Sequence, residues 1–264
     1  MPDALLEFTN VAYAWPDGRP VFSDLSFRIA AGEKVVLLGA NGAGKSTLLR
    51  LANGLLPPSG GSVAWQGRSL SPSLLRQRDF ARDFRQANVL LFQHPEAMLF
   101  NPTVREEIAY GPQQLGLADS AARVDRWAAE LGLQTLLDAA PFTLSGGQKQ
   151  KVALACLLAL DPQFLALDEP SASLDPATVG WLIDTLLDSG RTLLISTHNL
   201  GLAAELGERA LILDGSGRLL YDGPLEPALG DLPLLQAAGL AHRHRHRHGG
   251  ATHAHLHVHD WESS

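Results

Sequence analysis

The chain has 264 residues, of which 45% are hydrophobic and 19% charged, a balance typical of a globular protein with a buried core. Its formal net charge of −7 argues against a nucleic-acid partner, because general nucleic-acid binding favours a basic surface. The single cysteine, Cys156, excludes an internal disulfide and suits a reducing cytosol.

The apolar runs of the sequence are too short to cross a membrane. The longest, Val152–Leu160, falls far short of the ~20 residues that a spanning helix needs. The N-terminal MPDALLEF has no basic start followed by an apolar stretch, so we expect no signal peptide. A role at a membrane would therefore require a partner.

The first part of the chain predicts strands that lead into a helix. A turn at Ala31–Gly32 separates two β-rich stretches, and the second ends in a glycine loop. The expected elements are strands over residues 5–15, 25–30 and 34–38, a helix over 45–56 that ends near Asn53–Gly54, and a short hairpin over 57–70.

The middle of the chain predicts helices. Thr103 and Glu106 have the spacing of a capping box. One apolar helical face follows, and we expect it to pack in the core: Val124, Trp127, Ala128 and Leu131. Residues 146–160 predict another helix. We interpret the helical stretch over about 94–155 as an insertion.

Alternating strands and helices return after the insertion. Apolar strands are expected over 163–168 and 192–197, with a helix between them that begins near Pro176 and is capped by Asp175. A hairpin is expected over 209–223. This alternation predicts an α/β core with a mainly parallel sheet.

Two motifs indicate a nucleotide site. GANGAGKST matches G-x-x-x-x-G-K-[ST] between a strand and a helix, where backbone N–H groups can surround phosphates. FLALDEP ends an apolar strand in Asp168, which would hold Mg²⁺, and Glu169, which would orient the attacking water. In the glycine loop, Gly39–Thr47, the residues expected to bind ATP are Gly39, Asn41, Gly42, Gly44, Lys45, Ser46 and Thr47.

The segment LSGGQKQKVALA, residues 144–155, resembles the signature sequence of ATP-binding cassette (ABC) ATPases. The resemblance covers roughly residues 4–225 and implies a P-loop NTPase core with an antiparallel β subdomain and the inserted helical subdomain, within an ATP-binding domain over residues 1–240. Gln93 resembles the Q-loop glutamine, a Mg²⁺ and catalytic residue, and His198 the switch histidine, a second catalytic residue beside the general base Glu169. Trp15 resembles the aromatic that stacks on adenine. It also reads as a half-buried strand residue, with Tyr13 nearby.

The resemblance further implies a dimer. Ser145, Gly146, Gly147 and Gln148 open a helix whose N-terminus would face the ATP of a second ABC subunit, either a copy of this chain or a paralogue. Asp175 resembles the D-loop aspartate. Hydrolysis would remove the γ-phosphate contacts and loosen the dimer.

Residues 92–117 resemble the ATPases of energy-coupling factor (ECF) importers, which bring in vitamins or transition metals. The resemblance implies a peripheral subunit on the cytoplasmic face of the membrane, bound to an integral membrane partner. Met98, Leu99 and Phe100 suit either the groove for that partner or the core of the helical subdomain. A vitamin or other solute as cargo, and a non-transport ABC ATPase, stay open as alternatives.

Eight of the ten histidines lie in residues 241–264, which we expect to form a flexible tail. Imidazoles suit ions such as nickel and, by extension, cobalt, so the tail favours a transition-metal cargo. A solvated tail without function is the alternative. In an extended chain two sets of histidines would each share one side: His242, His244, His246 and His248, then His253, His255, His257 and His259.

Overall fold

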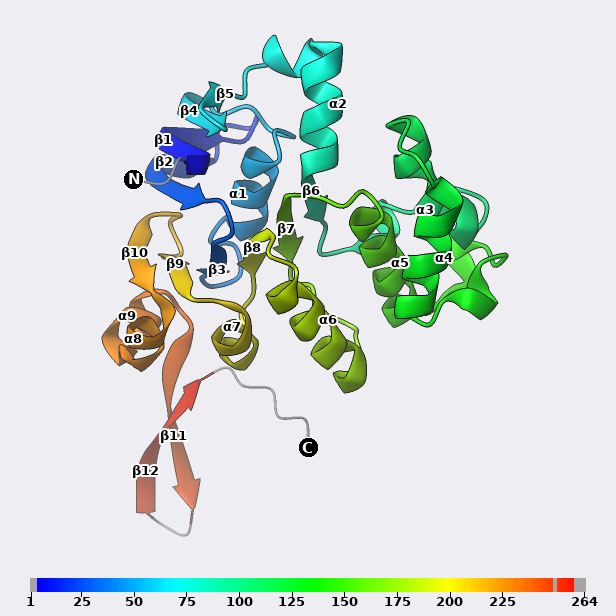
Figure 1. Cartoon of the computed structure of the whole chain (residues 1–264). Coiled ribbons are helices and arrows are strands. Elements are labelled where there is room, and N and C mark those ends of the chain that lie inside the picture. The colour runs from blue at the N-terminus through cyan, green and yellow to red at the C-terminus, as the bar shows by residue number, and fades with distance from the viewer. Residues whose placement is uncertain (1–3, 249–250, 259–264) are drawn as a thin grey trace.

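The computed structural model of the chain describes residues 4–248 and 251–258. Over these residues, a six-stranded sheet forms the centre (Figure 1). In spatial order its strands are β10 (Leu219–Pro224), β9 (Arg209–Leu213), β3 (Lys34–Leu38), β8 (Thr192–Ser196), β7 (Phe164–Asp168) and β6 (Asn88–Leu91). The strands from β9 to β6 are parallel, and β10 pairs antiparallel with β9 at one edge. The expected parallel α/β core is confirmed.

The central strands are covered on both faces, which explains their unbroken apolar sequences. Every residue of β7 and β8 is buried. Alternate residues of β3 serve different cores: Val35 and Leu37 pack with α1 (Lys45–Ala52) and the N-terminal sheet, and Val36 and Leu38 pack with the C-terminal helices. Two further helices lie along the sheet, α6 (Pro176–Asp188) and α7 (Leu200–Leu206).

A four-stranded antiparallel sheet packs beside α1. Its order is β2 (Pro20–Ala30), β1 (Ala4–Ala14), β4 (Gly60–Trp65) and β5 (Arg68–Ser69). Phe8 and Phe27 lie opposite each other in the register and stack with ring centroids 4.5 Å apart. This sheet is the antiparallel subdomain that the resemblance implied.

Several elements of the structure were not predicted from the sequence. Two of them are α2 (Arg78–Ala87), which follows a 3₁₀ turn at Leu74–Arg76, and β6. The helix buries only Ala81 and Phe84, so its apolar face is too narrow for a clear helical period. The edge strand β6 is four residues long and is tied to the end of α1, because Asn53 Nδ2 donates to Asn88 Oδ1 at 2.8 Å.

The helical layer lies to one side of the sheet, as expected (Figure 1). Trp127 is buried in its core, as the helical period predicted. The helices of this layer are α3 (Val104–Gln114), α4 (Ser120–Glu130) and α5 (Gly146–Leu158), with short 3₁₀ turns at Pro95–Ala97, Gln134–Leu136 and Pro141–Thr143. Thr103 caps α3 by accepting from the Glu106 N–H at 3.2 Å.

The C-terminal part packs against the glycine loop. Two short helices, α8 (Leu225–Gly230) and α9 (Leu232–Ala237), follow β10. The Ala40 N–H donates to the Ala238 carbonyl at 3.1 Å, and Leu240 is buried. No helix among the described residues combines the length and the apolar character needed to cross a bilayer.

Part of the histidine-rich segment, which we expect to form a flexible tail, has strand backbone in the structure. The backbone forms two antiparallel strands, β11 (Ala241–His248) and β12 (Ala251–Val258), which project from the rest of the molecule (Figure 1). The physical reason lies in the pattern of the sequence. Residues alternate with a period of two, and two glycines separate the stretches, a combination typical of a hairpin.

Candidate functional site: a nucleotide cleft

The glycine loop joins β3 to α1, and its glycines are required by geometry. Gly44 has φ +95° at the start of α1, and a Cβ there would lie 2.8 Å from side-chain atoms of Val21 and Phe22. At Gly39 a Cβ would lie 2.9 Å from the Leu213 carbonyl oxygen. Larger residues would therefore displace the loop. The loop leads directly into the N-terminus of α1, where free N–H groups favour an anion.

Lys45 lies at the centre of this loop. Its Nζ donates to the carbonyl oxygens of Gly39 at 2.7 Å and Ala40 at 3.2 Å. Burial lowers the pKa of the Lys45 ammonium, and the nearby carboxylates of Glu169 and Asp168 oppose that effect. The ammonium is therefore held at the cleft by groups of the loop itself.

The two acidic residues lie at the end of β7, and the adjacent strand β8 positions both. Asp168 pairs with Ser196 in the parallel register, and the Ser196 hydroxyl donates to Asp168 Oδ1 at 2.5 Å. The Glu169 N–H donates to the Ser196 carbonyl at 3.0 Å. Glu169 has φ +50°, a left-handed conformation that is uncommon for a residue with a side chain.

The Glu169 carboxylate contacts the histidine that follows β8. His198 Nδ1 lies 2.8 Å from Glu169 Oε1. An ionised carboxylate can only accept a hydrogen bond, so Nδ1 is the donor in this pair. Nε2 is the ring nitrogen that does not contact Glu169. The Glu169 side chain is 10% exposed and that of His198 51%, so the pair lies at the rim of the cleft.

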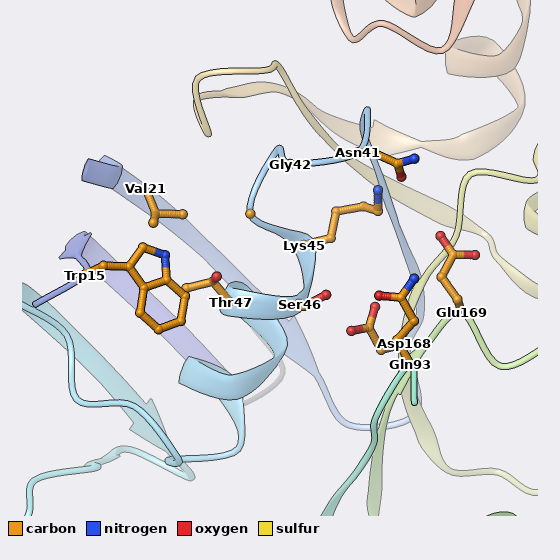
Figure 2. Close-up of a pocket in the computed structure, with 11 residues that line it drawn as sticks. Trp15, Val21, Asn41, Gly42, Lys45, Ser46, Thr47, Gln93, Asp168 and Glu169 are labelled. Atoms are coloured by element: carbon orange, nitrogen blue, oxygen red, sulfur yellow. The ribbon is translucent and has the colours of Figure 1, made fainter. Parts of the chain in front are cut away.

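A cleft of about 450 Å³ brings most of the expected nucleotide residues together. Figure 2 shows Lys45 extending toward Asn41 on the side of the cleft that also holds Asp168, Glu169 and Gln93, with Trp15 and Val21 on the other side. Trp15 lines the cleft, whereas Tyr13 is buried in the core, so the structure distinguishes these two aromatics. The lining residues are Trp15, Val21, Asn41, Gly42, Gly44, Lys45, Ser46, Thr47, Gln93, Asp168 and Glu169.

The signature segment, Leu144–Gln148, does not line this cleft. Ser145 caps α5 by accepting from the Gln148 N–H at 3.3 Å, and Gln148 Oε1 accepts from the Ser145 N–H at 2.9 Å. Gly147 packs so closely on the loop after β7 that a Cβ would lie 2.6 Å from the Ser173 carbonyl oxygen. The chain thus presents a second helix N-terminus, that of α5, outside the cleft.

Asp175, expected as a helix cap and a nucleotide-site residue, also lies outside the cleft. It caps α6, because the Thr178 N–H donates to Asp175 Oδ1 at 3.0 Å. Lys151 Nζ lies 3.4 Å from its other carboxylate oxygen. The aspartate therefore links α6 to the helix that follows the signature segment.

The cleft offers oxygen donors to a cation. Ser46, Gln93 and Asp168 contribute a hydroxyl, an amide and a carboxylate to its lining. These groups fit Mg²⁺, which prefers oxygen ligands and is completed by water and phosphate oxygens. Among the described residues, no group of three His, Cys, Asp or Glu side chains could hold a metal ion by itself. The expected tail ligand His259 lies outside the described residues.

The sequence patterns did not predict Ser196 or Val21 as site residues. Ser196 directly precedes the TH of THNL and orients Asp168, so its position at the end of a buried strand was the available signal. Val21 carried none, because it is one apolar strand residue among many. The three residues of Met98–Phe100, expected either in a groove for the membrane partner or in the core of the helical subdomain, differ in their surroundings. Met98 and Leu99 pack on the helical core, and the Phe100 ring is exposed and lies edge-on to Tyr110.

A strand, a glycine loop and a helix, with acidic residues at the end of a parallel strand, define a P-loop nucleotide-binding cassette. The sequence profile of the ABC transporter family matches residues 22–172 of the chain. The chain belongs to this family, and its cassette is an ABC-type ATPase domain.

Individual relatives agree with the family profile. The chain is 38% identical to the energy-coupling factor transporter ATP-binding protein EcfA of Methanothermobacter thermautotrophicus, over 89% of this chain and 76% of that protein. It is 44% identical to a putative ABC transporter ATP-binding protein of Gloeobacter violaceus, over 86% and 92%. Among solved structures, CbiO1 of Clostridium perfringens, part of the ABC transporter complex CbiONQ, superposes with a TM-score of 0.72 at 28% identity, over 89% and 94%.

Proposed function

We propose that this chain is the ATP-hydrolysing subunit of an ECF-type importer and that it drives uptake of cobalt or nickel through a membrane partner. The observation that carries the ATPase part is the cleft, where the glycine loop, Lys45, Asp168 and Glu169 meet. The relatives named EcfA and CbiO1 support the importer part.

Residues of the cleft divide the work of hydrolysis. Trp15 stacks on the adenine, and the N–H groups of the glycine loop with Lys45 hold the phosphates. Ser46 and Asp168, with Gln93, would hold Mg²⁺, which neutralises charge on the β- and γ-phosphate oxygens. Glu169 accepts the proton of the attacking water. His198, which is hydrogen-bonded to Glu169, contacts the γ-phosphate.

The second half of each nucleotide site comes from another subunit. Because the signature segment does not line the chain's own cleft, the N-terminus of α5 is available to the ATP of a second cassette. The signature residues of one subunit face that ATP, with Asp175 beside them. They are Ser145, Gly146, Gly147 and Gln148. Two subunits therefore close on ATP and separate after hydrolysis, which is the motion passed to the membrane partner.

The membrane partner docks beside the Q-loop glutamine. Phe100 and Tyr110, which follow Gln93 in the sequence, have exposed aromatic rings. The two residues are 66% and 41% exposed, and their ring centroids lie 4.9 Å apart. Exposed aromatic side chains are enriched at protein interfaces. In this proposal the chain is a peripheral subunit on the cytoplasmic face of the membrane, held there by the membrane partner.

The metal cargo is supported by the histidine-rich segment, and it fits the resemblance of residues 92–117 to the ATPases of ECF importers. The experiment isolates the transporter complex from membranes, reconstitutes it, and measures uptake of radiolabelled cobalt, nickel and a set of vitamins. We expect Mg-ATP-dependent uptake of cobalt or nickel. Uptake of a vitamin alone would replace the cargo, and failure to copurify with any membrane subunit would contradict the transport role.

A further inference from the structure

Gln150 is a polar side chain buried where the signature helix meets the loop that follows β7. It lies on α5 and is 1% exposed. Its Nε2 donates to the Pro170 carbonyl at 3.1 Å. Burying an amide is costly unless the amide is hydrogen-bonded, so this contact is a fixed part of the packing. Pro170 directly follows Glu169, which lines the nucleotide cleft.

The loop after β7 has an uncommon backbone conformation. Glu169 and Ser173 are left-handed, with φ +50° and +65°, and the Ala172 N–H donates to the Glu169 carbonyl at 3.1 Å. Conformations of this kind persist only where the surrounding structure holds them. Pro170 has no N–H, so its carbonyl is the one backbone group through which it can be hydrogen-bonded. The Gln150 amide occupies that group.

Two further contacts join the same face of α5 to this loop. Residues three and four apart lie on one face of a helix. The three contacts along this face are Gly147 with Ser173, Gln150 with Pro170, and Lys151 with Asp175. The ion pair of Lys151 and Asp175 is partly exposed, and such pairs contribute little. The hydrogen bond of Gln150 is buried, and its acceptor lies next to Glu169 in the chain.

We propose that Gln150 is a positioning residue for ATP hydrolysis, because its hold on the Pro170 carbonyl keeps the Glu169 carboxylate in the geometry that accepts a proton from water. Gln150 does not line the cleft, so it acts through Glu169. A displacement of about 1 Å can slow a reaction about a hundredfold. The inference rests on the role of Glu169 given under the proposed function and adds a residue from outside the cleft.

The first experiment removes the amide and keeps most of the side-chain volume. Gln150→Met and Gln150→Leu leave the Pro170 carbonyl without its donor. ATP hydrolysis is measured on the full chain in complex with its partner subunits. We expect kcat to fall at least about tenfold and KM for ATP to stay within about twofold of the native value, because the residues that bind the nucleotide are unchanged. Native kcat in both variants would overturn the proposal.

A control variant separates positioning from a general loss of stability. Val124 is 1% exposed in the core of the helical layer and lies on α4, which makes none of the three contacts with the loop. Urea unfolding gives the stability of each chain. We expect Val124→Ala to lower the free energy of unfolding and to keep the native kcat. A kcat that falls in proportion to stability in both the Val124 and the Gln150 variants would overturn the proposal.

The second experiment combines the changes at Gln150 and Glu169. A residue that acts through the Glu169 carboxylate has little further effect once that carboxylate is gone. We therefore expect Gln150→Met to lower the residual single-turnover rate of Glu169→Gln less than about twofold. A further tenfold loss in the double variant would show an independent role and would overturn the proposal.

The results distinguish this inference from the proposed function. Slow hydrolysis by Glu169→Gln with native hydrolysis by Gln150→Met would overturn the positioning role and leave the ATPase and transport roles standing. Native hydrolysis by Glu169→Gln would overturn the base assignment and the positioning role with it. Uptake of a vitamin combined with slow hydrolysis by Gln150→Met would replace the cargo and support the role of Gln150.

Discussion

Glu169 owes its position to its backbone as much as to its side chain. The residue adopts φ +50°, and its N–H is fixed by the Ser196 carbonyl at 3.0 Å. Strained backbone of this kind is found where the surrounding structure holds a functional group in place. The resulting contact with His198 at 2.8 Å leaves the carboxylate at the cleft, where a general base is needed.

Replacing Glu169→Gln should uncouple binding from hydrolysis. The amide keeps the size of the side chain but cannot accept a proton, so we expect ATP to bind normally and the hydrolysis rate to fall at least about a hundredfold. Phosphate release and a nucleotide-binding assay measure the two effects. Glu205→Gln, at an exposed position of α7, is the matched control. Normal hydrolysis by the Glu169 variant would refute the base assignment.

Asp175 is the residue whose titration is most clearly set by local structure. The Thr178 hydroxyl and N–H both donate to it and lower the pKa of its carboxyl from 3.8 to about 2, with a smaller contribution from the Lys151 charge. A carboxyl with a depressed pKa in the folded state stabilises the fold above its unfolded pKa. That contribution is lost as the pH falls through the folded pKa.

The variant Asp175→Asn tests this linkage. Asparagine keeps an oxygen for the Thr178 N–H but carries no charge. The free energy of unfolding of the native chain should therefore fall relative to the variant between about pH 4 and about pH 2, with a constant difference above pH 5. Urea unfolding of both chains at several pH values gives the comparison. A difference that does not change over this acidic range would contradict the assignment.

The segment after α9 supports the glycine loop from below. Ala238 accepts the Ala40 N–H at 3.1 Å, and Leu240 and Ala241 are buried in the core that contains Leu38. Gly239 lies between Ala238 and Leu240 and adopts φ +70°. A Cβ at this position would lie 3.0 Å from the Ala40 Cβ. An element far along the chain thus helps to hold the phosphate-binding loop.

Gly239→Ala should weaken both the fold and the nucleotide site. A side chain in a left-handed conformation costs about 1–2 kcal/mol, and the new Cβ also presses on Ala40 in the loop. Gly132→Ala is the control, because Gly132 has φ +66° and nothing within 4 Å of its Cβ position. We expect similar losses of stability in both variants and weaker ATP binding only in the first. Equal ATP affinity would show that the segment does not position the loop.

At the scale of the whole molecule, the helix N-terminus after the glycine loop and the helix N-terminus of the signature segment lie in separate places. The N-terminus of α1 opens on the cleft, and that of α5 packs beside the loop containing Ser173 without lining the cleft. Under the proposed function, one chain therefore offers a nucleotide half of the groups that bind it, and the signature segment of a second cassette offers the rest. This division is the physical basis for the proposed closure of two subunits on ATP.

Gly146→Ala tests that division. A Cβ at Gly146 would lie 3.7 Å from the Ser173 Cβ, an ordinary contact, so the isolated chain should fold and bind ATP as before. The methyl group would instead obstruct the nucleotide of the partner subunit. We expect at least about tenfold slower hydrolysis in the assembled complex. Gly180→Ala on α6, with nothing within 4 Å, should leave the rate unchanged. Full activity of the Gly146 variant would contradict the shared site.

Local patterns were sufficient for the chemistry of the cleft. The glycine loop and the LDEP strand end carry their functional groups within a few residues, so spacing along the chain already fixes which of those groups emerge together. The caps at Thr103 and Asp175 were predictable for the same reason, since a cap and its N–H partner lie three residues apart. The parallel core followed from the alternation of apolar strands with helices along the chain.

Contacts between distant segments decided the rest. The strand order places β8 between β3 and β7 and thereby brings Ser196 and His198 to the acidic pair, which no local pattern contains. Packing of the N-terminal sheet buried Tyr13 and left Trp15 at the cleft. The hairpin register likewise depends on which residues of two strands meet. Such choices are settled by burial and pairing across long sequence separations, and periodicity along a single segment carries no information about them.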